Sequence, residues 1–267
     1  MYLIDLERTT FKITTRCTLK CKLCQAFIPY YKEHTDISLD DAKLIVQDYF
    51  SIIDSVKNFS ITGGEPLMHK DLASILKVIF KYTDQIKQTI CIITNGTLVM
   101  KEDVLDILST NKKTRVVISD YGTILSPRVA FLVNALEARN IQYRIDSYQG
   151  NSRDKYGGWI DYRDHSLKHT TDEAIKNQAS NCFWRKGHYY EINYGELHPC
   201  ARSFWRMHSG IIPKDKTQYI DLLNNEKSIE EKRALLAKIE KLTFLNSCAY
   251  CSGNKEGTKR YRPAEQF

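Results

Sequence analysis

Three closely spaced cysteines, Cys17, Cys21 and Cys24, constrain this chain more than any other feature of its 267 residues. Their spacing is C-x3-C-x2-C, and they follow residues 7–15, where apolar and polar side chains alternate as in a half-buried strand. Three such thiolates can bind one metal centre, and they supply one ligand fewer than the four irons of a [4Fe–4S] cluster need. One iron would stay open, which distinguishes a reactive metal site from a structural one. The alternative is a zinc knuckle with a distant fourth ligand.

Strands and helices are predicted to alternate after this loop. Ser38 is a good N-cap for a helix reaching residue 53, with Asp40 and Asp41 in its first turn. Further strands are expected at 57–62, 89–94, 115–119 and 142–145, and helices at 70–80, 102–108 and 126–139. This order predicts an α/β fold with a parallel sheet and right-handed crossovers, either open or curled into a barrel.

Polar and glycine-rich segments follow several of these strands. Gly63-Gly64-Glu65-Pro66 ends one strand, Thr94 and Asn95 end the next, and Ser119 ends the one after. In parallel α/β folds, ligands bind at the carboxyl ends of the strands, which is also where the cysteine loop lies. Ordinary strand-end polar residues are the alternative reading of Thr94, Asn95 and Ser119.

The cysteine triplet followed by Gly63-Gly64-Glu65 resembles the radical S-adenosylmethionine (radical SAM) superfamily. The resemblance implies a partial (β/α)6 TIM-type barrel whose open iron chelates SAM. It implies that Glu65 and the exposed edge beside it accept hydrogen bonds from the SAM ammonium group, and that Thr94, Asn95 and Ser119 contact the ribose or carboxylate. Many members have an aromatic residue just before the third cysteine, where this chain has Leu23.

A second set of four cysteines lies in a different kind of sequence. The alternation ends in an irregular bridge over residues 146–178, so we expect a barrel domain at 1–175 and a smaller domain at 176–267. The smaller domain is predicted to contain a hairpin at 188–200, a helix at 228–242 with a capping box, and a loosely ordered tail at 253–267. Its cysteines are Cys182, Cys200, Cys248 and Cys251.

Four thiolates can saturate a [4Fe–4S] cluster and leave no open iron. This set resembles the Twitch domain, a shortened SPASM domain that holds one auxiliary cluster. The resemblance therefore implies two [4Fe–4S] clusters and SAM as cofactors. The alternative is a zinc ribbon held by the same thiolates. Cys91, the remaining cysteine, is expected to be a buried small hydrophobic residue.

Composition limits the setting of the protein. No apolar run has transmembrane length and no signal pattern precedes Asp5, so we expect a cytoplasmic protein without membrane contact. In that compartment cysteines bind metals more often than they form disulfides. The net charge of +7 includes no long basic block, so we do not expect nucleic acid as a partner. The positive charge favours an anionic substrate.

The resemblance also implies a reaction. In this superfamily a 5′-deoxyadenosyl radical removes a hydrogen atom from substrate, and an external electron donor such as flavodoxin or ferredoxin supplies the first electron. The size of the chain and both cysteine sets resemble the aminocyclitol dehydrogenases typified by butirosin biosynthesis. We therefore expect an oxidoreductase of carbohydrate biosynthesis that oxidises a secondary alcohol of a sugar-like or cyclitol substrate to a ketone.

Residue roles in that reaction follow from position. Lys12 and Arg202 are candidate substrate contacts, and Arg163 and His165 in the bridge are candidate proton acceptors. An epimerase would need an accessible thiol, for which only Cys91 is available. A peptide-modifying maturase is less expected, because such relatives often carry a peptide-recruiting module and no residues precede the barrel to form one. A zinc-stabilised binding protein is the alternative from another class.

Overall fold

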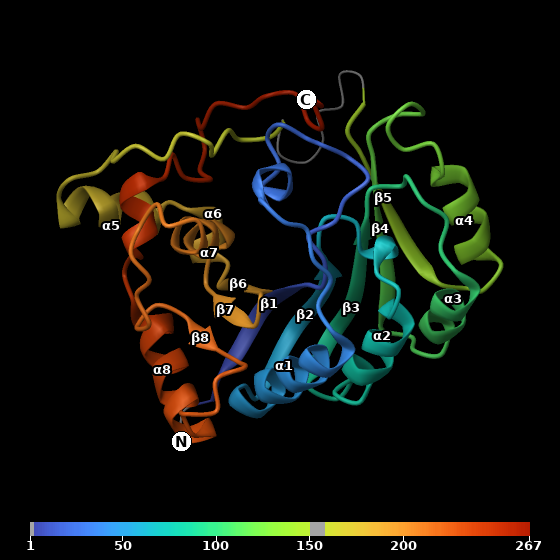
Figure 1. The fold of residues 1–267 in the computed structure, drawn as a ribbon, viewed down its shortest axis with the longest axis horizontal. Helices are drawn as coiled ribbons and strands as arrows, with labels where there is room; N and C mark the ends of the chain where they lie inside the picture. Colours follow the sequence, from blue (N-terminus) through green and yellow to red (C-terminus); the bar gives the residue numbers. More distant parts are fainter. Residues whose placement is uncertain (1–2, 150–157) are drawn as a thin grey trace.

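The computed structural model describes residues 3–149 and 158–267. Four βα units alternate from the amino end, and two further parallel strands complete a curved sheet (Figure 1). The strands are β1 (Asp5–Lys12), β2 (Ser55–Thr62), β3 (Ile86–Thr94), β4 (Thr114–Asp120), β5 (Gln142–Ser147), β6 (Tyr189–Asn193), β7 (Glu196–His198) and β8 (Ile220–Asp221). The helices are α1 (Leu39–Ile52), α2 (Leu72–Phe80), α3 (Glu102–Ser109), α4 (Val129–Glu137), α5 (Asp172–Ser180), α6 (Phe183–Lys186), α7 (Ala201–His208) and α8 (Ile229–Lys241), with short 3-10 helices at Ile28–Tyr30, Pro66–Met68 and Asn246–Tyr250.

The sheet has the order β5-β4-β3-β2-β1-β6-β7-β8, in which β5 to β6 are parallel and the last two strands are antiparallel. This confirms the predicted α/β, partial TIM-type barrel class. The sixth parallel strand is β6, which pairs with β1, with Arg8 opposite Tyr189. We expected β6 only as a strand of the hairpin at 188–200 in the smaller domain. The sheet therefore continues past residue 176, and the division at 175 stays a prediction.

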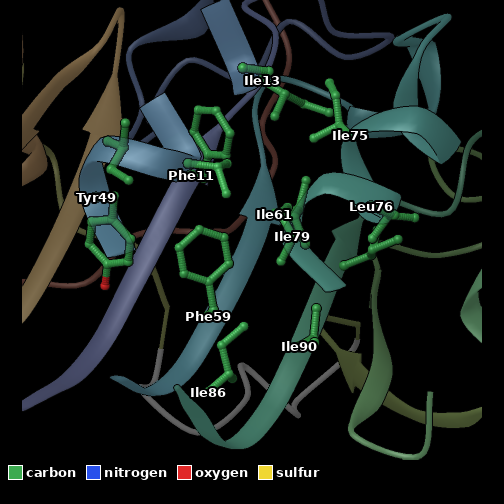
Figure 2. Packing of buried hydrophobic residues seen from close by; sticks show 14 of the residues in the cluster. Phe11, Ile13, Tyr49, Phe59, Ile61, Ile75, Leu76, Ile79, Ile86 and Ile90 are labelled. Atoms are coloured by element: carbon green, nitrogen blue, oxygen red, sulfur yellow. The ribbon is translucent and has the colours of Figure 1, made fainter. Parts of the chain in front are cut away.

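Apolar residues on the outer face of the strands pack against the helices and form the main core. Phe11 and Phe59 project from β1 and β2 toward Tyr49 of α1, and Ile75 and Ile79 of α2 cover the neighbouring strands (Figure 2). The predicted caps explain where two helices begin. The Ser38 side chain accepts a hydrogen bond from the Asp41 amide, and Ser228 forms the predicted capping box at the start of α8.

The helix predicted at 126–139 begins later than expected, because α4 begins at Val129. The Ser126 hydroxyl instead donates to the carbonyl oxygens of Asn95 and Ser119, and so connects the ends of two strands. Among the described residues, no helix is both long and apolar enough to cross a membrane.

Candidate functional site

The loop that carries Cys17, Cys21 and Cys24 is fixed to the segment following β2 by backbone contacts. The amides of Gly64 and Glu65 donate to the carbonyl oxygens of Thr14 and Arg16, each at 2.8 Å. A Cβ atom at Gly64 would lie 2.2 Å from the Arg16 oxygen, and one at Gly63 would lie 2.4 Å from the Thr14 oxygen. We expected these glycines to allow close approach to a ligand. In the structure they allow close approach of the cysteine loop itself.

Glu65 is fully buried and organises the ends of β2 and β3. Its carboxylate accepts hydrogen bonds from the Leu67 amide at 3.1 Å, the Thr94 hydroxyl at 2.8 Å and the Asn95 amide at 2.7 Å. Burial raises the pKa of Glu65 to about 7, although these three donors act in the opposite direction. The side chain thus positions Thr94 and Asn95 in this conformation, and its contact with the SAM ammonium group stays a prediction.

Two of the three cysteine sulfurs receive hydrogen bonds from side-chain amides. Asn95 Nδ2 lies 3.6 Å from Cys17 Sγ, and Gln266 Nε2 lies 3.2 Å from Cys21 Sγ. Burial raises the pKa of Cys17 to about 12 and that of Cys21 to about 11. The unligated groups are therefore neutral thiols, and iron binding would release their protons.

Space for a ligand lies on both sides of this loop. Cys17 borders a cavity of about 650 Å³ that also contacts Arg16 and Met68. A second cavity, of about 630 Å³, lies between the ends of β4 and β5 and residues 262–266. Both lie at the carboxyl ends of the parallel strands, where the motif positions predict binding.

The four remaining predicted ligands, Cys182, Cys200, Cys248 and Cys251, line one cavity. The first two are N-caps of α6 and α7, while the second two lie within and directly after the 3-10 helix Asn246–Tyr250. Helix ends and a tight turn therefore bring together cysteines that are far apart in the sequence, since 69 positions separate Cys182 from Cys251. All eight cysteines are free in this structure.

The same cavity contains buried hydrogen-bond donors without acceptors. Arg202 is 1% exposed and its Nε and Nη1 atoms have no partner, and Gln178 Nε2 also has none. Tyr162 and Trp184 flank the guanidinium, with their ring centroids 4.7 and 4.6 Å from it. Burial acts to lower the pKa of Arg202, but the electrostatic influence of Cys200, Tyr162 and Cys251 raises it more, so the group stays charged.

Arg206, one helical turn after Arg202 on α7, is a buried arginine whose guanidinium has protein acceptors, and it serves as a comparison. It is equally buried, but it donates to the Ser247 carbonyl at 3.1 Å, the Ser247 hydroxyl at 2.8 Å and the Tyr250 carbonyl at 2.9 Å. Arg202 therefore differs from Arg206 in lacking acceptors, not in burial. A buried cation of this kind implies an anionic acceptor in the cavity. We expected Arg202 to contact substrate; its enclosure beside the second cysteine set does not favour that role, which stays a prediction.

A buried aromatic cluster separates the two cysteine sets, and sequence reasoning did not identify it. Phe27 stacks on Trp205 with centroids 4.9 Å apart, and the cluster also contains Tyr162 and Cys251, with Cys17 and Cys24 packed against it. The aromatic residues that follow Cys24 and Cys200 in the sequence were the available signal. One apolar cluster thus contacts cysteines of both sets.

The structure also locates the weaker candidates. Lys12 and Glu191 form a buried ion pair of 2.6 Å between β1 and β6, so the Lys12 ammonium already has a partner. Ser119 lies at the end of β4 near Ser126, outside the Glu65 network. Cys91 is buried as expected, but in register it stands between Ser60 and Arg115 rather than in the apolar core.

The two candidate bases are poorly suited to accept a proton. Arg163 forms a bidentate ion pair with Asp161, at 2.8 and 2.6 Å, and this contact raises the pKa of the guanidinium. Burial lowers the pKa of His165, with Arg206 adding to the effect, and His165 Nδ1 accepts from Arg206 Nε at 3.3 Å. Protonation of Nδ1 would break that bond. Both roles remain predictions that these contacts do not favour.

Comparison with known proteins identifies the barrel. Residues 11–119 match the family model of the Radical SAM superfamily. A GTP 3′,8-cyclase of Campylobacter jejuni subsp. doylei is 34% identical over 86 residues, which are 32% of this chain and 26% of that protein. An S-adenosylmethionine-dependent nucleotide dehydratase of Selenomonas ruminantium is 33% identical over 95 residues, 35% of this chain and 31% of that protein. The chain thus spans about a quarter to a third of these relatives.

Solved structures resemble the whole chain. BtrN in complex with AdoMet and 2-DOIA has a TM-score of 0.63 at 15% identity, covering 96% of this chain and 97% of BtrN. The structure of anSMEcpe with AdoMet has a TM-score of 0.56 at 14% identity, covering 98% and 92%. At these identities the likeness establishes the fold alone. The family match therefore identifies residues 11–119 as a radical SAM domain, a class that uses SAM and a [4Fe–4S] cluster, and the solved structures show that the whole chain shares their fold.

Proposed function

We propose that this chain is a radical SAM dehydrogenase with two [4Fe–4S] clusters. Cys17, Cys21 and Cys24 would hold the cluster that binds SAM, and Cys182, Cys200, Cys248 and Cys251 would hold the second. When bound, SAM and the first cluster supply a 5′-deoxyadenosyl radical, which removes a hydrogen atom from substrate carbon. The substrate is a secondary alcohol of a sugar-like or cyclitol compound, and the product is the ketone.

The observation that carries this proposal is the pair of unsatisfied donors, Arg202 and Gln178, in the four-cysteine cavity. A fully ligated iron–sulfur cluster is an anion whose sulfides and thiolates accept hydrogen bonds. These buried donors favour an anionic cluster over a zinc ribbon.

The electron balance explains why a second cluster is useful. The substrate loses one hydrogen atom from carbon to the radical, one proton from the hydroxyl group, and one further electron. A sealed cluster has no open iron for substrate and is suited to accept that electron, which would cross the apolar cluster around Phe27 and Trp205. A small-molecule anionic substrate, such as a sugar phosphate or sugar nucleotide, remains our expectation, and an external flavodoxin or ferredoxin would reduce the first cluster.

The proposal is tested with reduced enzyme, SAM and a panel of cyclitols, sugar phosphates and sugar nucleotides under anaerobic conditions. We expect about eight irons per chain, as two four-iron clusters require, and one 5′-deoxyadenosine for each ketone formed. Colourless protein that binds zinc would overturn the cofactor assignment. Product with unchanged mass in water and one deuterium gained in D2O would instead indicate epimerisation.

Epimerisation is the second candidate, because Cys91 lies among polar neighbours on its strand face. The charges of Arg144, Arg8 and Arg115 act on the Cys91 thiol, although burial dominates and raises its pKa to about 11. A thiol there could return a hydrogen atom to a substrate radical. The variant Cys91→Ser separates the two candidates: ketone formation should persist, whereas an epimerase would lose turnover but retain SAM cleavage.

A further inference from the structure

Residues 261–267 lie across the cysteine loop, although we expected this segment to be loosely ordered. The segment crosses the top of the molecule above the loop that follows β1 (Figure 1). Tyr261 exchanges two backbone hydrogen bonds with Trp159, of 2.7 and 2.9 Å. Farther along, the Lys22 amide donates to the Glu265 carbonyl at 2.7 Å, and the Phe267 amide donates to the Lys20 carbonyl at 3.1 Å. We call residues 261–267 the strap.

Side chains reinforce the strap at both ends of its contact with the loop. Lys22 Nζ and a Glu265 carboxylate oxygen are 2.7 Å apart, and both side chains are partly exposed. The Phe267 ring packs edge-on against Tyr30, with centroids 5.7 Å apart. Tyr30 in turn donates to the Lys22 carbonyl at 2.7 Å. The strap is therefore held by several contacts besides those of Gln266.

Gln266 lies between these contacts and its amide has a fixed orientation. The Lys20 amide donates to Gln266 Oε1 at 2.7 Å, and a backbone N–H can only donate. The side-chain NH2 group must then face the other way, where it lies 3.2 Å from Cys21 Sγ and 2.6 Å from the Ala264 carbonyl. The direction of the N–H···S bond thus follows from its neighbours rather than from an arbitrary choice of oxygen and nitrogen.

We propose that Gln266 is a positioning residue for the SAM-binding cluster, and that its N–H···S bond to Cys21 raises the reduction potential of that cluster. Hydrogen bonds to cluster sulfurs are one of the determinants of the potential. The reduced cluster carries one more negative charge than the oxidised cluster, so a donor stabilises it more. Gln266 lies 245 positions after Cys21 in the sequence, and its hydrogen bond would make the cluster easier for the electron donor to reduce.

The test measures the midpoint potential of the cluster by anaerobic redox titration monitored by electron paramagnetic resonance. The signal that changes when SAM is added identifies the cluster with the open iron. Gln266→Met keeps the side-chain length and removes the donor, and Gln266→Ala removes the side chain. Glu265→Gln is the matched control, because it weakens the strap at the neighbouring residue and leaves the Gln266 bond in place. Iron content is measured for all variants.

We expect both Gln266 variants to have a more negative midpoint potential than the wild type, with iron content unchanged, and Glu265→Gln to match the wild type. Unchanged potentials in both Gln266 variants would overturn the proposal. Equal shifts in the Gln266 and Glu265 variants would also overturn it, because the effect would then follow from the strap as a whole. Loss of the SAM-responsive signal in both Gln266 variants, with that signal retained in Glu265→Gln, would likewise contradict a role limited to the potential.

Discussion

The two cysteine sites differ in how the protein completes them. At the first site, the donors that face the sulfurs come from Asn95 and Gln266, and each amide also has a protein partner. Cavities of about 650 and 630 Å³ lie beside that loop. At the second site, Arg202 and Gln178 have donors without acceptors, and helix ends enclose the cysteines. The first site has space for a ligand, whereas the second is enclosed and contains buried donors that no described residue accepts from.

This difference fits our proposal that the chain holds two clusters with different tasks. The polar groups of a ligand-binding site must keep hydrogen-bond partners when the ligand leaves. The network of Glu65 and Asn95 meets that requirement. A permanently filled site can rely on its cofactor to satisfy buried donors. The stability of the two sites should therefore respond differently to iron.

Removing one cluster-binding cysteine from each site should have the largest effect on activity and should distinguish the two sites most clearly. In Cys251→Ala we expect ketone formation to be abolished while SAM is still cleaved, because the first site is intact. In Cys24→Ala we expect both activities to be abolished. Quantifying 5′-deoxyadenosine and ketone in the same samples checks this. Loss of SAM cleavage in Cys251→Ala, with iron at the first site retained, would show that the two sites do not act separately.

Gly64→Ala should be the most damaging substitution that leaves all cysteines in place. The new Cβ would lie 2.2 Å from the backbone oxygen of Arg16, so the cysteine loop must move. We expect a loss of at least about 3 kcal/mol in the free energy of unfolding, and loss of SAM binding. Gly210→Ala is the control, since its φ is +72° but no atom lies within 4 Å, and it should cost about 1 kcal/mol. Urea denaturation measures both, and equal costs would refute the close-packing role of Gly64.

Glu65 should give the first site a pH dependence that the second lacks. Because burial raises the pKa of Glu65 from 4.5 to about 7, the folded chain keeps a proton that the unfolded chain has released within that interval. The contribution of Glu65 to the free energy of unfolding should then decrease as pH rises from about 4.5 to 7, by at most about 3 kcal/mol, and be constant above that range. Glu65→Gln should remove this decrease. Urea denaturation of both proteins between about pH 5 and 8 tests the difference, and identical slopes would contradict it.

Arg202→Met, compared with Arg206→Met, gives the smallest effect but the sharpest test of the second site. Without iron, Arg202 is an unpartnered buried charge, so its removal should cost little or should stabilise the chain. With iron, removal should destabilise it by about 1–3 kcal/mol. Arg206 has protein acceptors, so its removal should destabilise both forms similarly. Thermal unfolding before and after iron removal checks the four cases, and equal responses of the two variants would exclude the proposed role of Arg202.

Local signals predicted the barrel well. Strand and helix periodicity, the Ser38 cap and the Ser228 capping box act within a few residues, so the sequence alone located the elements from β1 to β5, but not α5. The sixth strand was assigned to the wrong unit because β6 is short and its pairing with β1 joins residues that are far apart in the sequence. Hairpin signals in the sequence describe only its pairing with β7.

Site chemistry was predictable where it depends on spacing and not where it depends on packing. The cysteine sets and the Gly63–Glu65 segment carry their own signals. The burial of Arg202, the partner of Lys12 and the Gln266–Cys21 bond all depend on contacts between distant segments. A charged residue in a sequence is by default solvent-exposed, and nothing local distinguished Arg202 from Arg206.

The central claim is that one cluster has an open iron that binds SAM and the other is fully ligated by cysteines. The most direct test is electron paramagnetic resonance of the reduced protein with and without SAM, combined with iron analysis. We predict about eight irons per chain, and a SAM-induced change in the signal of one cluster only, because only one has an open iron. About four irons, or a spectrum in which both clusters respond to SAM, would contradict this account.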